Sequence, residues 1–348
     1  MKRILLLSSL LIANMCITYA QKKSNNTVGY RVLIDNPDKV HPVFVALDLL
    51  TADTWNTSSF MGYGLRADIN ARRFGSISFD YRKGYLGAKQ RATELGGSLN
   101  LFSSRKNTIA RVVLSSSSIA IGSKMLHRSS GIEVPAIKKT MLQARGGIAS
   151  FRAPIEEAPD GLGKTPDEDS RSFYMTSDTN NVRIGFGKGY KGVYGFKAMM
   201  KMNIYYVGLS VRTIKNVVLS HDRGISSNSN NYNFFVDILT GGDPGFSDVA
   251  YTYTTSALGT YEFPAGTLPE QYSLSVNDIK TMGWRAGWEA KTNAGMAMCY
   301  KVEFGSRPGY RMGSGILSAN AYILLTGGIS ISAGNNHKKI AKEKKDTE

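Results

Sequence analysis

Residues 282–305 have the sequence MGWRAGWEAKTNAGMAMCYKVEFG, in which apolar and polar side chains alternate on both sides of a short turn signal. Trp284 and Trp288 share one set of alternate positions, and Arg285 and Glu289 share the other. Successive side chains of a β-strand point to opposite faces, so this alternation predicts two strands that each have one apolar and one polar face.

The turn of this predicted hairpin falls at residues 293–295, which end on a glycine. Glycine readily adopts the positive φ angle that a three-residue hairpin loop requires. Such a loop predicts that Arg285 lies opposite Glu303 on the polar face. On the apolar face it predicts that Trp288 lies opposite Tyr300.

Similar alternation recurs along most of the chain. Nine segments show it strongly: 61–69, 77–81, 95–101, 142–148, 205–211, 232–238, 282–290, 296–304 and 321–332. Four show it weakly: 44–50, 109–114, 182–186 and 250–254. Because single-chain bacterial barrels have even strand numbers, these segments predict about 12 strands, with a range of about 10 to 14.

The chain lacks the helical segments and long buried runs that would build a separate core. Strands with one apolar and one polar face are then expected to close on themselves, because a closed barrel pairs every backbone polar group within the membrane. The predicted fold class is all-β, a transmembrane antiparallel up-and-down β-barrel with an apolar outside and a polar inside.

The alternation also predicts which side chains take each face. Twelve charged residues are expected inside the barrel: Arg66, Asp68, Asp80, Arg82, Glu94, Arg145, Arg212, Asp237, Arg285, Glu289, Lys301 and Glu303. Eight apolar or aromatic residues are expected to face lipid: Tyr63, Leu65, Phe79, Trp284, Trp288, Met298, Tyr300 and Phe304. The interior set holds six cations and six carboxylates, which predicts a neutral interior.

The N-terminus has the pattern of a cleavable secretory signal peptide. Lys2 and Arg3 precede an apolar run, and a small residue, Ala20, ends the segment. The run is shorter than the roughly 20 residues that a membrane-spanning helix needs. The predicted organisation is a signal peptide at 1–20, a periplasmic segment at 21–41, the barrel at 42–334 and a basic disordered tail at 335–348.

Cleavage of this signal peptide would leave Cys299 as the single thiol, so an exported chain could form no internal disulfide. Its stability is then expected to come from a large hydrogen-bonded fold. Four polar connections are predicted to be solvated loops: 119–138, 153–178, 216–229 and 258–275. The loops at 119–138 and 153–178 follow one another along the chain. The sequence therefore does not decide which of these connections is periplasmic and which is external.

The signal peptide, the glycine-rich amphipathic strands, their aromatic ends and the absence of structural cysteines together resemble Gram-negative outer-membrane β-barrel proteins. This resemblance covers nearly all of the mature chain and implies a porin-like protein of the cell envelope. The chain departs from the family pattern at its C-terminus, where a basic tail replaces the usual terminal aromatic residue. The family's usual assembly signal is therefore in doubt for this chain.

The formal net charge is +16, yet the sequence has no nucleic-acid-binding module and no basic helix. The expected partners are outer-membrane lipids. Cations assigned to loops are expected either to contact lipopolysaccharide phosphates or simply to be solvated, and the sequence favours neither. These cations are Lys83, Lys89, Arg91, Arg105, Lys106, Lys124, Arg128, Lys138, Lys139, Lys188 and Lys191.

The expected function is non-enzymatic, either a structural or adaptor protein or a narrow solute channel, without catalytic residues, metal or cofactor. One alternative is an outer-membrane lipid-modifying enzyme, for which His127 with Ser129 or Ser130 is the local candidate. Another is a soluble secreted β-sandwich that binds a ligand.

Overall fold

The computed structural model describes seventeen stretches of the chain, and every regular element in them is a β-strand. These stretches are 29–38, 42–55, 60–71, 74–85, 89–121, 124–157, 173–177, 183–185, 187–189, 192–221, 224–242, 244–255, 259–264, 272–276, 279–292, 296–310 and 320–333. The predicted signal peptide at 1–20, the predicted tail at 335–348 and the predicted turn at 293–295 lie outside the described residues.

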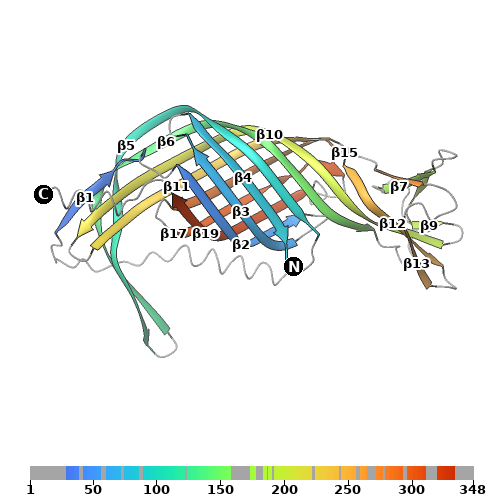
Figure 1. The fold of residues 1–348 in the computed structure, drawn as a ribbon, viewed down its shortest axis with the longest axis horizontal. Coiled ribbons are helices and arrows are strands. Elements are labelled where there is room, and N and C mark those ends of the chain that lie inside the picture. Colours follow the sequence, from blue (N-terminus) through green and yellow to red (C-terminus); the bar gives the residue numbers. More distant parts are fainter. Residues whose placement is uncertain are drawn as a thin grey trace.

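Ten strands form one closed antiparallel barrel (Figure 1). Their bounds are β2 (Val43–Trp55), β3 (Phe60–Asn70), β4 (Gly75–Gly84), β5 (Arg91–Ile121), β6 (Lys124–Glu157), β10 (Gly192–His221), β11 (Gly224–Gly241), β16 (Met282–Thr292), β17 (Met296–Ser306) and β19 (Ala321–Ala333). Each strand pairs with the next in this order, and pairing of β2 with β19 completes the circle. This arrangement confirms the predicted up-and-down barrel and contradicts the β-sandwich alternative.

Nine of these strands contain the strongly alternating segments, and the weak segment 44–50 supplies β2. The ten barrel strands lie within the predicted range of 10 to 14. The other weak segments account for the higher central prediction of about 12 strands. Segment 109–114 is the distal part of β5, while segments 182–186 and 250–254 overlap β8 (Arg183–Gly185) and β12 (Gly245–Thr255). Neither β8 nor β12 belongs to the closed barrel.

Val43 pairs with Ala333, so both ends of the barrel chain lie at one rim, which we name the terminal end. The opposite rim, the loop end, receives the long connections from β6 to β10 and from β11 to β16. Strands β3 and β4 are connected at the terminal end, where Ala71 N–H donates to the carbonyl of Gly75.

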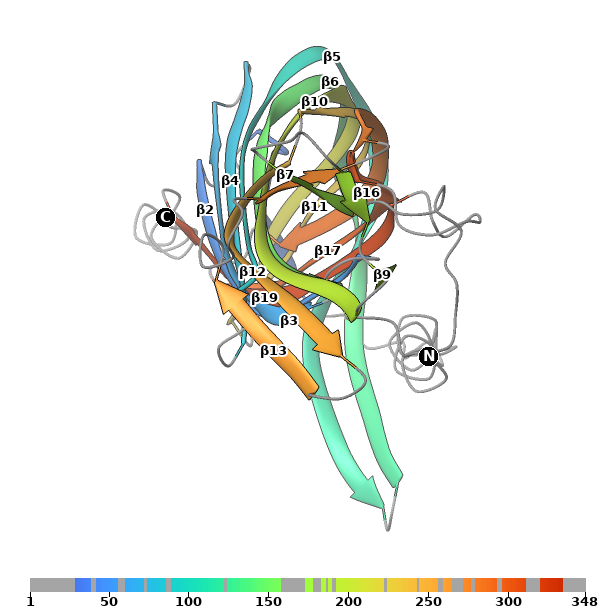
Figure 2. The same ribbon diagram turned by 90° about the vertical axis from the view of Figure 1, so that its right-hand side faces the viewer.

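Two hairpins at the terminal end extend far beyond their barrel neighbours. Strands β5 and β6 pair up to Ile121 and Lys124, although β4 pairs with β5 only as far as Leu99. The paired β5–β6 arm projects sideways from the barrel (Figures 1 and 2). The loops predicted at 119–138 and 216–229 are therefore wrong, because serine- and asparagine-rich sequence can still pair across a hairpin.

The second extended hairpin consists of β10 and β11, which pair as far as His221 and Gly224. The β5–β6 arm packs on it through a small apolar cluster. Ala110 and Val112 of β5, Val134 of β6, and Val217 and Leu219 of β10 are all buried there. Asn228 of β11 donates its side-chain amide to the carbonyl of Arg111 on β5 at 2.6 Å. This packing holds the two hairpins against each other outside the barrel.

Short elements surround the barrel. Strand β1 (Tyr30–Asp35) pairs with β10 at the terminal end, beyond the point where β6 leaves it. Strand β12 pairs with β10 toward the loop end and carries β13 (Gly259–Pro264), and β9 (Gly187–Gly189) also pairs with β10. Two small sheets lie apart: β7 (Phe173–Ser177) with β8 and β14 (Tyr272–Val276), and β15 (Ile279–Lys280) with β18 (Gly309–Tyr310).

The predicted register of the β16–β17 hairpin is wrong by two residues. Arg285 pairs with Gly305, and Gly287 pairs with Glu303. A shift of two keeps every side chain on its face, so alternation alone cannot distinguish the two registers. In the observed register each of these long charged side chains faces a glycine across the strands, which gives it room in a narrow interior.

Candidate functional site in the barrel interior

The structure brings all twelve predicted interior charges together on the inward face of the barrel. Eight of them are buried: Arg66, Asp80, Arg82, Glu94, Asp237, Arg285, Lys301 and Glu303. The other four are partly buried: Asp68, Arg145, Arg212 and Glu289. Four further described charges lie among them, namely Asp48, Asp53, Lys291 and Arg307, so this set of sixteen consists of eight carboxylates and eight cations.

Asp48 and Asp53 escaped prediction because of a bulge in β2. The pairing of β2 with both neighbours shifts between Asp48 and Thr51, and Leu49 and Leu50 are both exposed on the outside. An extra residue at this point reverses the alternation, so two aspartates five positions apart point the same way. Lys291, by contrast, shares the polar face of Glu289, and the alternation could have identified it.

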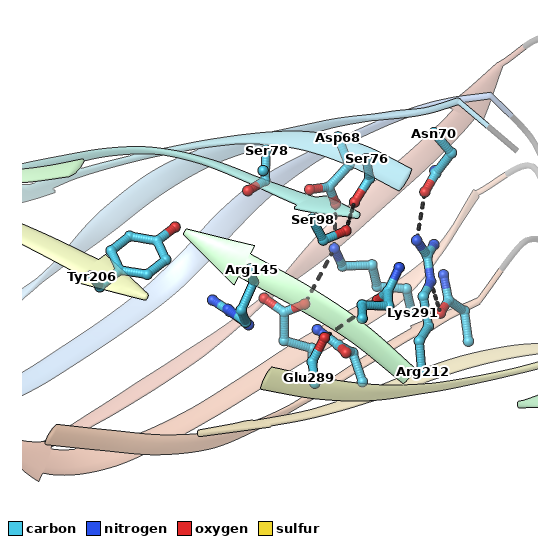
Figure 3. Close-up of a pocket in the computed structure, with 15 residues that line it drawn as sticks. Asp68, Asn70, Ser76, Ser78, Ser98, Arg145, Tyr206, Arg212, Glu289 and Lys291 are labelled. Atoms are coloured by element: carbon cyan, nitrogen blue, oxygen red, sulfur yellow. Dashed lines mark hydrogen bonds and ion pairs between the residues drawn. The ribbon is translucent and has the colours of Figure 1, made fainter. Parts of the chain in front are cut away.

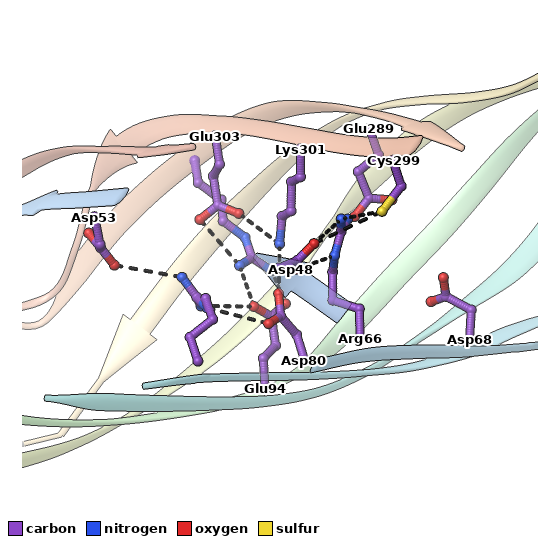
Figure 4. A network of polar contacts seen from close by, with 12 residues as sticks. Asp48, Asp53, Arg66, Asp68, Asp80, Glu94, Glu289, Cys299, Lys301 and Glu303 are labelled. Carbon is purple, nitrogen blue, oxygen red and sulfur yellow. Dashed lines mark hydrogen bonds and ion pairs between the residues drawn. The ribbon is translucent and has the colours of Figure 1, made fainter. Parts of the chain in front are cut away.

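Buried charges, among them Glu94, Lys301 and Glu303, form an ion-pair network inside the barrel (Figure 4). Arg285 is its centre. Its guanidinium makes two hydrogen bonds to the Glu94 carboxylate, at 2.7 and 3.1 Å, and one to Asp237 at 2.7 Å. Glu303 lies 3.6 Å away, and the Lys301 ammonium is 3.2 Å from that carboxylate. Arg285 also stacks over the Tyr206 ring at 4.1 Å. The predicted contact of Arg285 with Glu303 thus exists, but diagonally and as one of three.

Two more arginine–aspartate pairs extend this network along the barrel. Toward the loop end Arg307 binds Asp53 through two hydrogen bonds at 2.8 and 2.9 Å, and its guanidinium lies 3.7 Å from the centre of the Tyr322 ring. Toward the terminal end Arg66 binds Asp48 at 2.6 and 2.7 Å. The Cys299 sulfur accepts a bond from Arg66 at 3.2 Å, so the predicted single thiol is buried within this network.

An apolar layer fills the barrel interior near the loop end. Met200, Met202 and Ile204 of β10 point inward and contact Phe151 of β6 and Leu324 of β19, all of them buried. Side chains here replace the water that fills a porin lumen. The side chains of this layer are at most 8% exposed.

The terminal half of the interior contains a polar cavity of about 60 Å³ (Figure 3). Arg212 lines it and donates to the side-chain oxygens of Asn231 at 2.9 Å and Asn70 at 2.7 Å. Lys291 lines it too and forms ion pairs with Asp68 and Glu289. At about 10–15 Å³ per water molecule, the cavity has room for a few waters.

The N-terminal segment lies beside this cavity. Pro37 and Asp38 line a second cavity of about 20 Å³ that shares Arg212 with the first. The Asp38 carboxylate pairs with Lys139 at 2.6 Å and also with Arg105. The described interior therefore consists of a polar cavity, a charged middle and an apolar layer.

The outward face carries the eight residues that were predicted to face lipid. Met298, Phe304, Trp284, Leu65 and Tyr63 are between 39% and 60% exposed. The remaining three, Phe79, Trp288 and Tyr300, are partly buried against neighbouring side chains of the same face. Aromatic pairs lie on this outward face. The rings of Trp284 and Phe304 meet edge to face with centres 5.9 Å apart, and Trp288 stacks on Tyr232 with ring centres 6.2 Å apart.

His127 lies on the β5–β6 arm, outside the barrel. Its Nδ1 is 2.7 Å from Ser118 Oγ, and both side chains are exposed. The serines that the enzyme alternative named are elsewhere: Ser130 bonds to Ser115, and Ser129 pairs across the hairpin with Ser116. Among the described residues no carboxylate contacts His127.

The described part of the chain contains no helix that is long and apolar enough to cross a membrane. It also contains no group of three or more histidine, cysteine, aspartate or glutamate residues placed to hold a metal ion.

Comparison with known proteins adds little to this description. No protein-family model and no curated protein sequence matches the chain. Among solved structures, the CymD monoaromatic hydrocarbon channel matches over 86% of this chain and 92% of its own, with 8% identity and a TM-score of 0.20. A likeness this distant carries no argument, and the fold rests on the strand pairing described above.

Proposed function

We propose that this chain is an integral outer-membrane β-barrel protein with a closed interior, which serves as a structural or adaptor protein of the Gram-negative cell envelope. One observation carries the proposal, the inverted polarity of the barrel. Its charges point inward, while large apolar side chains such as Val207, Leu209 and Val236 are more than half exposed on the outside. Such a surface is unfavourable in water and favourable in hydrocarbon.

The limits of the apolar surface support membrane insertion. Lys201 and Asn203 of β10 point outward near the loop end, while Met200 and Met202 point inward, which is the polarity of a soluble barrel. From Tyr205 onward the polarity is inverted. A strand that leaves the hydrocarbon for water is expected to exchange its faces in this way.

Two rows of outward cations bracket the apolar surface. The loop-end row consists of Lys83, Arg91, Arg152 and Lys201, which pair with one another across β4, β5, β6 and β10. The terminal-end row consists of Lys106, Lys138 and Lys215 on β5, β6 and β10. On β10 the rows are 14 residues apart. At about 3.3 Å per residue and a tilt of about 40°, this separation is about 35 Å along the membrane normal, slightly more than the roughly 30 Å of hydrocarbon.

The filled interior favours a structural or adaptor role over a solute channel. Arg82 and Arg307 are at most 2% exposed although they lie in the lumen, and the apolar layer covers them toward the loop end. We also propose that the protein is not an enzyme, because the exposed Ser118–His127 pair has neither a third member nor a pocket among the described residues.

The proposed orientation has the terminal end in the periplasm, because outer-membrane barrels have short periplasmic turns and longer external loops. The two extended hairpins would then project into the periplasm, where they offer a surface to envelope partners. The loop-end row would lie at the outer leaflet, and we propose that it contacts lipopolysaccharide phosphates. Of the cations that the sequence assigns to loops, Arg105, Lys106, Lys138 and Lys139 lie instead in paired strands at the terminal end, and Lys124 and Arg128 lie on the β5–β6 arm.

Recordings in planar bilayers test the closed interior. The refolded protein, with heat-dependent migration on a detergent gel as the check of folding, is expected to show no stepwise conductance. An open porin-type barrel, inserted under the same conditions, serves as the control for insertion and detection. Repeated steps of constant size from this protein would reject the closed barrel and favour a narrow solute channel.

A further inference from the structure

Three lysines of the terminal-end row are aligned on adjacent strands. Lys106 pairs directly with Lys138, and Lys138 pairs directly with Lys215. Lys106 and Lys138 are exposed, and Lys215 is partly buried. Among the described residues no carboxylate lies within ion-pair distance of any of the three.

Like charges directly opposite each other destabilise a sheet. In the neighbouring inward pair, Arg105 opposite Lys139, the Asp38 carboxylate contacts both cations and offsets part of their repulsion. The outward row has no such partner among the described residues, although it lies only one residue away along the same strands. A counter-anion from outside the protein would relieve this repulsion.

The outward side chains between the apolar surface and the lysine row indicate the source of such an anion. Along the same three strands the outward side chains change from apolar to hydroxyl to lysine. The apolar row is Phe102, Leu142 and Val211, and the hydroxyl row is Ser104, Thr140 and Thr213. This gradient matches the passage from hydrocarbon to headgroups, where long cationic side chains direct their charge toward the interface.

We propose that Lys106, Lys138 and Lys215 form a binding site for the phosphate of an acidic phospholipid in the periplasmic leaflet. Neighbouring strands lie about 4.8 Å apart, so the three strands span about 10 Å, a width that suits one headgroup. Strands β5 and β6 continue beyond this row as the arm, which projects sideways from the barrel (Figure 1), so bound lipid would lie near the base of the arm. This inference rests on the proposed membrane insertion.

Native mass spectrometry of the detergent-solubilised full chain, titrated with phosphatidylglycerol, tests the site. The variant Lys106→Gln/Lys138→Gln/Lys215→Gln is expected to bind at least about fivefold more weakly than the wild type, since one lysine near an anionic surface contributes about 1 kcal/mol. The control Lys338→Gln/Lys339→Gln/Lys342→Gln loses the same charge and is expected to bind like the wild type. The same titration with lipopolysaccharide, using a loop-end variant, tests the outer-leaflet contact proposed above.

Two outcomes would overturn the site: equal affinity of the row variant and the wild type for phosphatidylglycerol, or equal competition by inorganic phosphate and phosphatidylglycerol. The second would show a site for free anions. A flotation assay with phosphatidylcholine vesicles separates this failure from failure of the proposed function. A protein that floats and shows the heat shift but has no row-dependent binding refutes only this site, whereas one that stays at the bottom refutes membrane insertion.

Discussion

Arg285→Gln is expected to destabilise the folded barrel by about 3 to 5 kcal/mol, the cost of leaving buried charges without their partner. The guanidinium contacts Glu94, Asp237 and Glu303, and each of these carboxylates is at most 5% exposed. Glutamine cannot neutralise them and reaches fewer acceptors. The loss should appear as a shift of the denaturant midpoint for unfolding from vesicles, measured by tryptophan fluorescence.

Arg105→Gln is the matched control, because the Arg105 side chain is 59% exposed and its partner Asp38 also pairs with Lys139. Exposed ion pairs contribute about 0 to 1 kcal/mol, so little change is expected. The exchange Arg285→Glu/Glu303→Arg should not restore stability, because Glu94 and Asp237 would still lack their arginine. Equal midpoints for Arg285→Gln and Arg105→Gln would show that the network is hydrated and the interior open.

Val207→Arg is expected to destabilise the barrel by about 2 to 4 kcal/mol, the cost of a cation on the lipid face near the bilayer midplane. Val207 is 65% exposed on the outside of β10 and lies almost midway between Lys201 and Lys215. In a soluble protein the same substitution at so exposed a site would change stability by about 0.5 kcal/mol or less. The measurement is the free energy of unfolding from vesicles.

Thr213→Arg on the same strand and face is the depth control. This residue lies one row above Lys215, so the cost of the arginine should fall to about 0 to 1 kcal/mol. Val207→Leu controls for the change in shape and should be nearly neutral. If the two arginine variants lose the same stability, the outward face does not experience a membrane of the proposed position and thickness.

Much of the barrel could be predicted because a membrane barrel displays its two faces in alternation. On β10, for example, the outward residues Val207, Leu209 and Val211 are apolar. The inward residues between and after them, Gly208, Ser210 and Arg212, are small or polar. The prediction failed where alternation carries no information. Gly305 lies opposite Arg285 in a register that differs by two residues from the predicted one, and both registers keep the same faces.

Other features broke the alternation itself. The bulge at Leu49 reversed the alternation of β2, so Asp48 and Asp53 were not assigned to the interior. Their ion pairs with Arg66 and Arg307 were therefore missed. The apolar interior layer was missed because Met200 and Met202 lie beyond the proposed membrane boundary, where the faces of β10 exchange polarity. In the β5–β6 arm, residues 119–138 were predicted as a loop because their serines resemble solvated connections, and composition does not report pairing between distant residues.

The most direct test of the membrane barrel is a depth profile along β10. In a Cys299→Ser background, single cysteines replace the outward residues at 201, 203, 205, 207, 209, 211, 213 and 215, with Ser210 as an interior reference. Each carries a fluorophore, which is quenched separately by brominated lipid and by aqueous iodide in vesicles. Lipid quenching is predicted to be strongest at 207 and 209, to decline toward 201 and 215, and to be weak at 210. Uniform iodide quenching at 205–211 would contradict the membrane barrel.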